Sequence, residues 1–305
     1  MVAFGCKRPG VTVRQLVLCS RNMEDLEAPV RHRRRRADTI PAMPSSAAVK
    51  AARLSSLHVG PRAFVIANAF DAGSAALLTQ LGFAALATSS GAAAGVLGRR
   101  DGQISRDEAL AHASEIAAAT DLPVSADLEN GFGDSPEEVA ETIRRTGATG
   151  IVGASIEDHS GDKSAPLYPI ELAAARIAAA VQAARALPFA SFAITARAEN
   201  FFRGRPDLDD TIARLRAYES AGADVLFAPA LPDLDAVRAV CAAVTRPVNF
   251  MVGIKGKSWD LATLEAAGVR RVSLATSLWR AAMTGVRAAA EEVRMSGTFG
   301  YVDRL

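Results

Sequence analysis

The sequence predicts an α/β protein whose fold is a (β/α)8 TIM barrel. From Ala47 onward, eight apolar runs alternate with helix-like segments, which indicates parallel strands joined by helical crossovers. The chain has 305 residues, 50% of them hydrophobic, and barrels of about 250 residues are ordinary single domains. An open doubly wound sheet is the alternative, but residues 68–73 read NAFDAG and lack the glycine pattern of a phosphate loop.

Each apolar run is short and is followed by polar or small residues, as expected for buried parallel strands. The expected strands are Phe64–Asn68, Ala84–Thr88, Pro123–Asp127, Gly150–Glu157, Phe192–Arg197, Asp224–Ala228, Pro247–Val252 and Arg271–Ala275. The expected helices between them are Ala72–Leu81, Ser105–Thr120, Ser135–Thr146, Pro169–Leu187, Leu208–Ala221, Leu234–Val244 and Trp259–Ala267. An extra helix over one end of the barrel is expected at Ala47–Leu57, and a last helix at Ser277–Met295.

Local end signals support these helices. Glycines stand directly after four of them, at Gly82, Gly147, Gly222 and Gly268, where helices commonly end. Ser135 is expected as an N-cap, because a proline follows it at the first helical position and two glutamates follow in the first turn.

Residues 1–45 differ from the rest of the chain. They show no sustained period and include the basic run Arg31–Arg36. Residues 1–50 carry a net charge of +6, whereas the remaining 255 residues carry −4. We interpret residues 1–45 as a disordered basic extension; a targeting arm or an anion-binding tail is the alternative. Residues 46–305 are expected to form the catalytic barrel, and its mild acidity argues against nucleic acid as a partner.

The three cysteines, Cys6, Cys19 and Cys241, have no metal-binding spacing and favour a reducing cytoplasm as the location. No apolar run reaches the ~18 residues of a membrane-spanning helix. The N-terminal apolar stretch is short and is interrupted by Arg14, so no signal sequence is expected. His58 falls on a predicted helix and is expected to serve packing rather than catalysis.

Two expected strands end abruptly in carboxylates. Asp127 and Glu129 follow the third strand in SADLENGFG, and Glu157 and Asp158 close the fourth in SIEDHSGDK. A carboxylate at the end of a buried strand is costly unless something neutralises it. Converging acids at one end of a sheet suggest Mg²⁺, which prefers oxygen ligands and keeps several waters. The alternative is that each acid caps a helix or lies in a solvated turn.

Other polar residues stand at the same end of the predicted barrel, where catalytic residues lie in this fold. Arg197 ends the fifth strand and can bind a carboxylate through two hydrogen bonds. The turn Ser89–Gly91 after the second strand can offer backbone N–H groups to an oxyanion. Asn249 lies in the seventh strand, either facing the site or bonding the backbone. The set suits a 2-oxo carboxylate whose enolate a metal stabilises.

The chain resembles the isocitrate lyase/phosphoenolpyruvate mutase superfamily over nearly all of residues 48–305. The resemblance rests on six motifs in order: TSSGAAAGVLGRRDG, SADLENGFGD, GASIED, ITARAEN, AGADVLF and SLWRA. It implies a Mg²⁺ site, with Mn²⁺ as a substitute. Asp127 matches the carboxylate nearest the metal, and Glu129 and Glu157 match acids that hold it directly or through water. Glu129 is one carbon longer than the family's frequent aspartate.

The resemblance also implies roles for the substrate-binding residues. Ser89, Ser90 and Gly91 match the turn that binds carboxylate or enolate oxygens. Asp101 matches an acid on a mobile loop, and Arg197 matches the arginine that binds the substrate carboxylate. The resemblance also implies a tetramer that is built as a dimer of dimers.

The last helix carries two further expectations from the same resemblance. Arg280, early in that helix, occupies the family's arginine position and is expected to contact substrate. The helix itself is expected to be exchanged between the barrels of two subunits.

The loop after the fourth strand departs from the family's pattern. Lyases of the family carry a KxCGH-like signature there, and its cysteine acts as a general acid. Lys163 matches the lysine, but Ala165 stands in place of the cysteine and has no proton to give. His159, Ser164 or Tyr168 could substitute. Mutases carry a longer loop with Lys and Asn residues, of which only Lys163 remains.

A second departure is the turn Phe227–Ala230, which reads FAPA and lacks the glutamate found there in methylisocitrate lyases. Classical isocitrate or methylisocitrate cleavage is therefore disfavoured. The sequence predicts a Mg²⁺-dependent enzyme that acts on a small 2-oxo acid or related di- or tricarboxylate through a metal-bound enolate of pyruvate type. Asp101, Arg197 and Lys163 are its expected catalytic residues. Carbon–carbon cleavage or decarboxylation is favoured; phosphorus–carbon bond chemistry and a non-catalytic carboxylate-binding protein are the alternatives.

Overall fold

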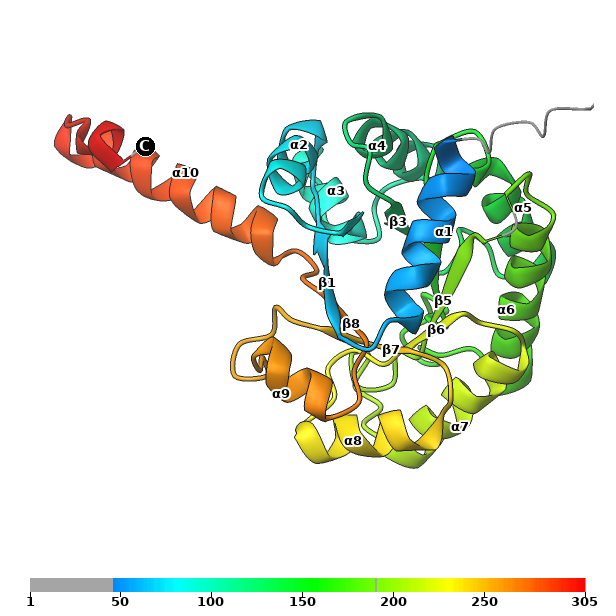
Figure 1. Cartoon of the computed structure of the whole chain (residues 1–305). Coiled ribbons are helices and arrows are strands. Elements are labelled where there is room, and N and C mark those ends of the chain that lie inside the picture. Colours follow the sequence, from blue (N-terminus) through cyan, green and yellow to red (C-terminus); the bar gives the residue numbers. More distant parts are fainter. Residues whose placement is uncertain (1–45, 190, 305) are drawn as a thin grey trace, which may run out of the picture. The chain divides into compact units, whose positions relative to one another are not determined.

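The computed structural model describes residues 46–189 and 191–304, and in them eight parallel strands close into a barrel in the order β1 to β8 (Figure 1). This confirms the predicted (β/α)8 architecture. The basic run Arg31–Arg36 lies outside the described residues. The strands are β1 Phe64–Asn68, β2 Ala85–Ala87, β3 Val124–Asp127, β4 Gly153–Glu157, β5 Ala193–Arg197, β6 Val225–Phe227, β7 Val248–Met251 and β8 Arg271–Ser273.

Every predicted helix is present, with ends that differ by a few residues. The helices are α1 Ser46–Val59, α2 Ala72–Gln80, α3 Ser90–Val96, α4 Arg106–Ala118, α5 Pro136–Thr146, α6 Ile170–Arg185, α7 Leu208–Ser220, α8 Leu234–Ala243, α9 Leu261–Ala266 and α10 Ser277–Ser296. Within the part of the chain that the structure describes, none of them combines the length and hydropathy needed to cross a bilayer.

The cap predictions hold in detail for α5. The Ser135 hydroxyl accepts a hydrogen bond from the Glu138 backbone N–H at 3.2 Å, and the Glu138 carboxylate accepts one from the Ser135 N–H at 3.0 Å. This reciprocal arrangement satisfies two donors that a helix start otherwise leaves unpaired. Gly147 ends the same helix with a φ of −56°, so this helix ends without a residue in the left-handed conformation.

Two elements were not predicted, the short helix α3 and a 3₁₀ turn at Gly300–Arg304. The sequence of α3, SGAAAGV, is built from small residues and carries no alternation of polar and apolar faces. Helical periodicity therefore gives no signal there. Its start is nevertheless capped, because the Ser89 hydroxyl accepts from the Ala92 N–H at 3.4 Å.

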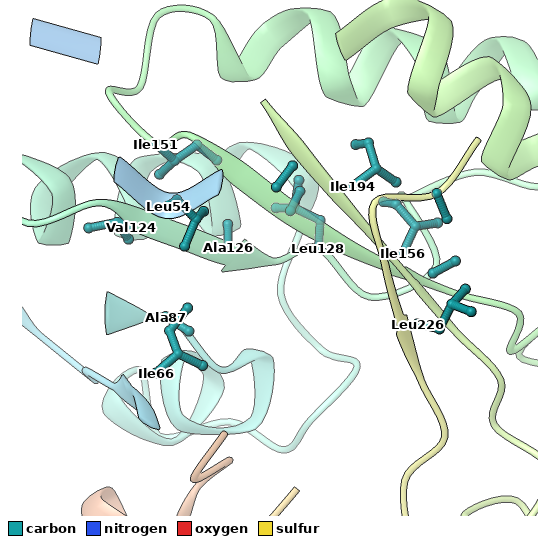
Figure 2. Close-up of a cluster of buried hydrophobic side chains, with 14 of the residues drawn as sticks. Leu54, Ile66, Ala87, Val124, Ala126, Leu128, Ile151, Ile156, Ile194 and Leu226 are labelled. Atoms are coloured by element: carbon teal, nitrogen blue, oxygen red, sulfur yellow. The ribbon is translucent and has the colours of Figure 1, made fainter. Parts of the chain in front are cut away.

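Helix α1 packs on the N-terminal end of the barrel, as predicted for an extra helix. Leu54 is fully buried, and Figure 2 shows it beside Val124, Ala126 and Ile151 of the barrel core. A Cβ added to Gly153, the first residue of β4, would lie 3.2 Å from the Leu54 Cδ2 atom. Because glycine leaves that space open, the Leu54 side chain can reach the barrel interior.

Helix α3 packs against the start of α10 through two glycines one turn apart. A Cβ on Gly91 would lie 3.0 Å from the Thr276 methyl group, and a Cβ on Gly95 would lie 2.5 Å from the Trp279 ring. The second distance is shorter than any real Cβ contact, so the indole occupies the place of the missing side chain.

The rest of α10 leads away from the barrel (Figure 1) and contains no buried residue. It exposes Met283, Val286 and Met295, at 45%, 58% and 72% of their surfaces. The exchange of this helix between subunits stays a prediction.

Candidate active site

A cavity of about 270 Å³ opens at the carboxyl ends of the strands and reaches into the barrel. This is the position at which barrel enzymes carry their active sites. Eight of the predicted site residues line the cavity. They are Ser89, Ser90, Gly91, Asp101, Asp127, Arg197, Asn249 and Arg280.

Asp127 is held by the turn that ends β2. Its Oδ2 atom accepts from the Ser90 N–H at 3.1 Å and from the Ser90 hydroxyl at 3.0 Å. Its own N–H donates to the Thr88 hydroxyl at 2.9 Å, and the Ser155 hydroxyl donates to Oδ1 at 3.3 Å. These bonds join the predicted substrate-binding turn to the predicted metal carboxylate.

Arg197 lies at the centre of a buried ion-pair network. Its Nε atom bonds the fully buried Glu199, and its Nη1 atom is 3.3 Å from Glu157 Oε2 and 4.0 Å from Asp127 Oδ1. Arg203 joins the same acids, with Nη2 2.9 Å from Glu157 Oε1 and Nε 2.9 Å from Glu199 Oε2. The two guanidinium groups therefore orient the carboxylates at the ends of β4 and β5.

Glu129 stands at the edge of this network without a partner for one of its oxygens. Its backbone has a φ of +50°, and its Oε1 atom is buried with no hydrogen bond. Burial and the negative charges of Asp127 and Asp101 raise the pKa of Glu129 to about 7. Burial likewise raises the pKa of Glu157, against the pull of Arg197.

This network holds more acids than arginines, and of its carboxylates only Asp127 lines the cavity, whereas Glu129 and Glu157 lie beside it. When all four are ionised, Asp127, Glu129, Glu157 and Glu199 outnumber Arg197 and Arg203 by two charges, and the raised pKa values of Glu129 and Glu157 show that protons relieve part of this excess in the metal-free chain. The excess equals the charge of one divalent cation, and carboxylate oxygens are the ligands that Mg²⁺ prefers. The unpaired Glu129 oxygen fits the same ion.

In the described residues, three acids are not arranged to bind one metal ion directly. Across the described residues, no three Asp, Glu, His or Cys side chains converge closely enough to enclose a metal. Mg²⁺ commonly keeps several waters and takes only one or two carboxylates from the protein. The residues therefore fit a partly hydrated ion.

The loop after β4 does not bring its predicted residues to the cavity. Lys163 is exposed and does not line the cavity. The three residues considered as substitutes for a general acid are engaged elsewhere. Tyr168 donates to Asp134 at 2.6 Å, the Ser164 hydroxyl donates to Asp162 at 2.8 Å, and His159 Nδ1 is 2.8 Å from the Pro166 carbonyl.

Asp158 does not join the acids at the mouth. Glu157 and Asp158 are neighbours in sequence and point to opposite sides of the barrel wall. The Oδ2 atom of Asp158 accepts from Tyr218 at 2.6 Å and from Arg214 at 3.0 Å, both on α7. Asp158 thus joins β4 to α7, which is a structural role.

Two groups of residues in the site were missed by the sequence analysis. Arg203 follows Glu199 by four residues, and this spacing could have indicated the ion pair. Phe202 and Phe227 lie within 5.8 Å and 5.2 Å of the Arg197 guanidinium, where aromatic faces attract a cation. No sequence pattern signals that contact, because Phe227 belongs to the next strand.

Asn249 faces the cavity, and both polar ends of its side chain are used within the barrel. Its Nδ2 donates to the Ser273 hydroxyl at 3.0 Å, and its Oδ1 accepts from Arg271 at 2.8 Å. Arg271 also lines the cavity and was not predicted as a site residue.

Comparison with known proteins agrees with this fold and with the family that the sequence resembles. The sequence profile of the phosphoenolpyruvate phosphomutase family matches residues 54–294. A crystal structure from Burkholderia cenocepacia J2315, described as that of a "putative lyase/mutase", is 50% identical with a TM-score of 0.83. The alignment covers 86% of this chain and 94% of that one.

Two further relatives carry different activities in their names. A second Burkholderia cenocepacia J2315 structure, described as a "putative phosphonomutase", is 38% identical with a TM-score of 0.74, over 81% of this chain and 99% of that one. The Corynebacterium glutamicum protein named "Probable 2-methylisocitrate lyase 2" is 31% identical over 274 residues, 86% of this chain and 87% of its own. The profile match covers most of the chain, and the chain belongs to the phosphoenolpyruvate phosphomutase family of enzymes.

Proposed function

We propose that this chain is a Mg²⁺-dependent enzyme that breaks or forms a bond beside the oxo group of a small 2-oxo acid or related carboxylate. The observation that carries the proposal is the cluster of four carboxylates, Asp127, Glu129, Glu157 and Glu199, around only two arginines, together with the unpaired Glu129 oxygen. Carboxylates that lie close together in a buried site repel one another, and a bound divalent cation relieves that repulsion.

The site residues are assigned the following roles. Asp127, Glu129 and Glu157 would hold the ion, directly or through water. When bound, Mg²⁺ supplies positive charge that stabilises a pyruvate-type enolate. The Ser89–Gly91 turn borders the cavity beside Asp127 and is placed to bind substrate oxygens.

Arg197 would bind the substrate carboxylate. Its ion pairs use Nε and Nη1, which leaves Nη2 for a ligand in the cavity that it lines. Asp101 lines the cavity next to Gly91, and it would act with Arg280 at the entrance. Lys163 would contribute only if its loop moves toward the cavity on closure.

Carbon–carbon cleavage or decarboxylation is the favoured reaction. Decarboxylation releases carbon dioxide without a protein cysteine acting as acid, which suits a chain with Ala165 in the loop. The alternative is phosphorus–carbon bond chemistry, favoured by the match to the phosphoenolpyruvate phosphomutase profile.

The first experiment measures pyruvate release from oxaloacetate, 2-methylisocitrate, 2,3-dimethylmalate, phosphonopyruvate and phosphoenolpyruvate, with and without Mg²⁺. Metal-dependent pyruvate from a carbon–carbon substrate supports the favoured reaction. Pyruvate from phosphonopyruvate alone supports the alternative. Tight oxalate binding without turnover of any substrate would instead mean a carboxylate-binding protein.

A binding measurement tests the metal site directly. Asp127→Ala should abolish Mg²⁺ or Mn²⁺ binding in calorimetry, because it removes the carboxylate at the centre of the hydrogen-bonded turn. Unchanged metal binding in that variant would refute the proposed site.

We further infer that the functional unit is a homo-oligomer, a dimer of dimers with α10 exchanged between barrels. The exposed apolar side chains of α10 and the absence of buried residues along this helix support the inference. Exposed apolar surface of this kind marks association sites.

A further inference from the structure

The cavity continues below Asp127 into a barrel interior that is polar. Ser125 stands two residues before Asp127 on β3 and shares its face, and Ser155, Asn249, Ser273 and Arg271 also line the cavity. Barrel interiors are usually packed with branched apolar side chains. The polar lining therefore makes the lower part of the cavity suitable for a polar ligand.

Arg271 lies at the floor of this region. It is the first residue of β8, and only 5% of its surface is exposed. Its Nε donates to Asn249 Oδ1 at 2.8 Å, its Nη2 donates to the Thr195 hydroxyl at 3.0 Å, and its Nη1 is 3.4 Å from His58 Nε2. These partners are an amide, a hydroxyl and an imidazole.

His58 does not supply the missing negative charge. Its Nδ1 is 2.9 Å from the Leu54 carbonyl, so the proton resides on Nδ1 and Nε2 accepts from Arg271. Burial and the charge of Arg271 lower the pKa of His58 to about 3, which keeps the imidazole neutral. Among the described residues, no carboxylate lies within ion-pair distance of Arg271.

A guanidinium buried without an anion is costly. Burial lowers the pKa of Arg271 to about 9, and the group is still protonated at neutral pH. The guanidinium has five N–H donors, of which its three protein contacts use three. Two N–H donors are left, and because Arg271 lines the cavity, a ligand in the cavity can accept hydrogen bonds from them.

We propose that Arg271 forms a second anion-binding position at the floor of the cavity and accepts one carboxylate of a small dicarboxylic acid. The planar guanidinium matches the two oxygens of a carboxylate, and its neutral partners keep the full positive charge available. Asn249 positions Arg271 through the Nε bond. The inference rests on the proposed function for the placement of the second carboxylate at the mouth, near Arg197.

The test measures binding by calorimetry at constant ionic strength, on chain that has been freed of metal with EDTA and then dialysed to remove the EDTA. Oxalate, malonate and succinate are compared with acetate and butyrate. At least one dicarboxylate should bind the wild-type chain about tenfold or more tightly than the monocarboxylates, as one charged hydrogen-bonded contact would give. Arg271→Met should remove this preference.

Arg270→Met is the matched control. Arg270 is the neighbouring residue, it lies outside the cavity lining, and it bonds the Pro61 carbonyl at 3.4 Å on the exposed side. This variant loses the same charge and should keep the wild-type preference. Arg271→Lys keeps the charge without the planar group and should bind dicarboxylates about tenfold more weakly than the wild type.

Three results would overturn the proposal. Wild-type affinity in Arg271→Met is the first. Equal wild-type affinities for dicarboxylates and monocarboxylates are decisive even if the variants do not fold. Full competition by chloride, with no preference among the organic anions, would assign the floor to a small inorganic ion. Because no metal is present, these outcomes report on anion binding at Arg271, whereas the Asp127→Ala metal titration reports separately on the Mg²⁺ site.

Discussion

Ser90 donates two hydrogen bonds, one from its backbone N–H and one from its hydroxyl, to the same carboxylate oxygen of Asp127. The turn that is expected to bind substrate thus also orients the acid that is expected to bind the metal. Binding at either place acts on the same short segment between β2 and α3.

Ser90→Ala should weaken Mg²⁺ binding about tenfold or more, since hydrogen-bond partners behind a metal ligand commonly contribute that much. The backbone bond remains, so the fold should be retained. Metal titration calorimetry provides the measurement. Ser105→Ala, which removes the N-cap of α4 away from the site, should lower stability by about 1 kcal/mol and leave metal affinity unchanged.

Glu129→Gln should reduce the stabilisation that Mg²⁺ provides. An ion at 100 times its dissociation constant stabilises a folded chain by about 2.7 kcal/mol, and loss of a charged ligand should remove much of that gain. Thermal unfolding in EDTA and in Mg²⁺ gives the difference for each variant. Exposed Glu137→Gln is the control. An undiminished Mg²⁺ effect in Glu129→Gln would exclude Glu129 from the metal site.

His58 should make the chain less stable in mild acid. Its folded pKa of about 3 lies below the ordinary value near 6.5, so the unfolded chain binds more protons between these values. The free energy of unfolding should therefore fall as pH decreases from about 6.5 toward 3, by up to about 1.4 kcal/mol per pH unit from this residue. Arg271, Phe64 and the Leu54 carbonyl face the ring.

Urea unfolding at a series of pH values measures this slope, and His58→Gln should flatten it. His112→Gln removes a histidine from α4 and serves as the comparison. Identical slopes in the wild type and in His58→Gln would show that His58 is not protonated on unfolding in this range.

Met283→Glu together with Val286→Glu should lower the oligomeric mass, because both side chains are exposed on α10 and would be buried in an exchanged helix. Light scattering coupled to chromatography measures the mass. Arg287→Gln, on the same helix and paired with Glu291, should leave it unchanged. A wild-type chain that is monomeric would contradict the proposed assembly.

The sequence was a good guide to the barrel because the information there is local. Short apolar runs mark each β–α unit and glycines end four of the helices, whereas the helix α3 was missed because its small residues carry no period. The ends of the strands could be placed for the same reason, and this located Asp127, Arg197 and the Ser89–Gly91 turn at the cavity.

The partners of those residues could not be found in this way. Arg271 bonds Asn249, Thr195 and His58, which are 22, 76 and 213 residues away in sequence. Closure of the barrel brings them together, and a lone arginine at the start of a strand gives no sign of it. Lys163 shows the opposite case, since a motif match predicts a site role for a side chain that does not line the cavity in this structure.

The glycine pair of α3 constrains any attempt to redesign this enzyme. Gly91 borders the cavity, and Gly95 lies against Trp279 of α10. A larger side chain at position 95 would push on the indole, and one at position 91 would press on Thr276 and Asp101. Substitutions in α3 that change the substrate range would therefore also change the direction in which α10 leaves the barrel. Variants selected for a new substrate should be screened for oligomeric assembly at the same time.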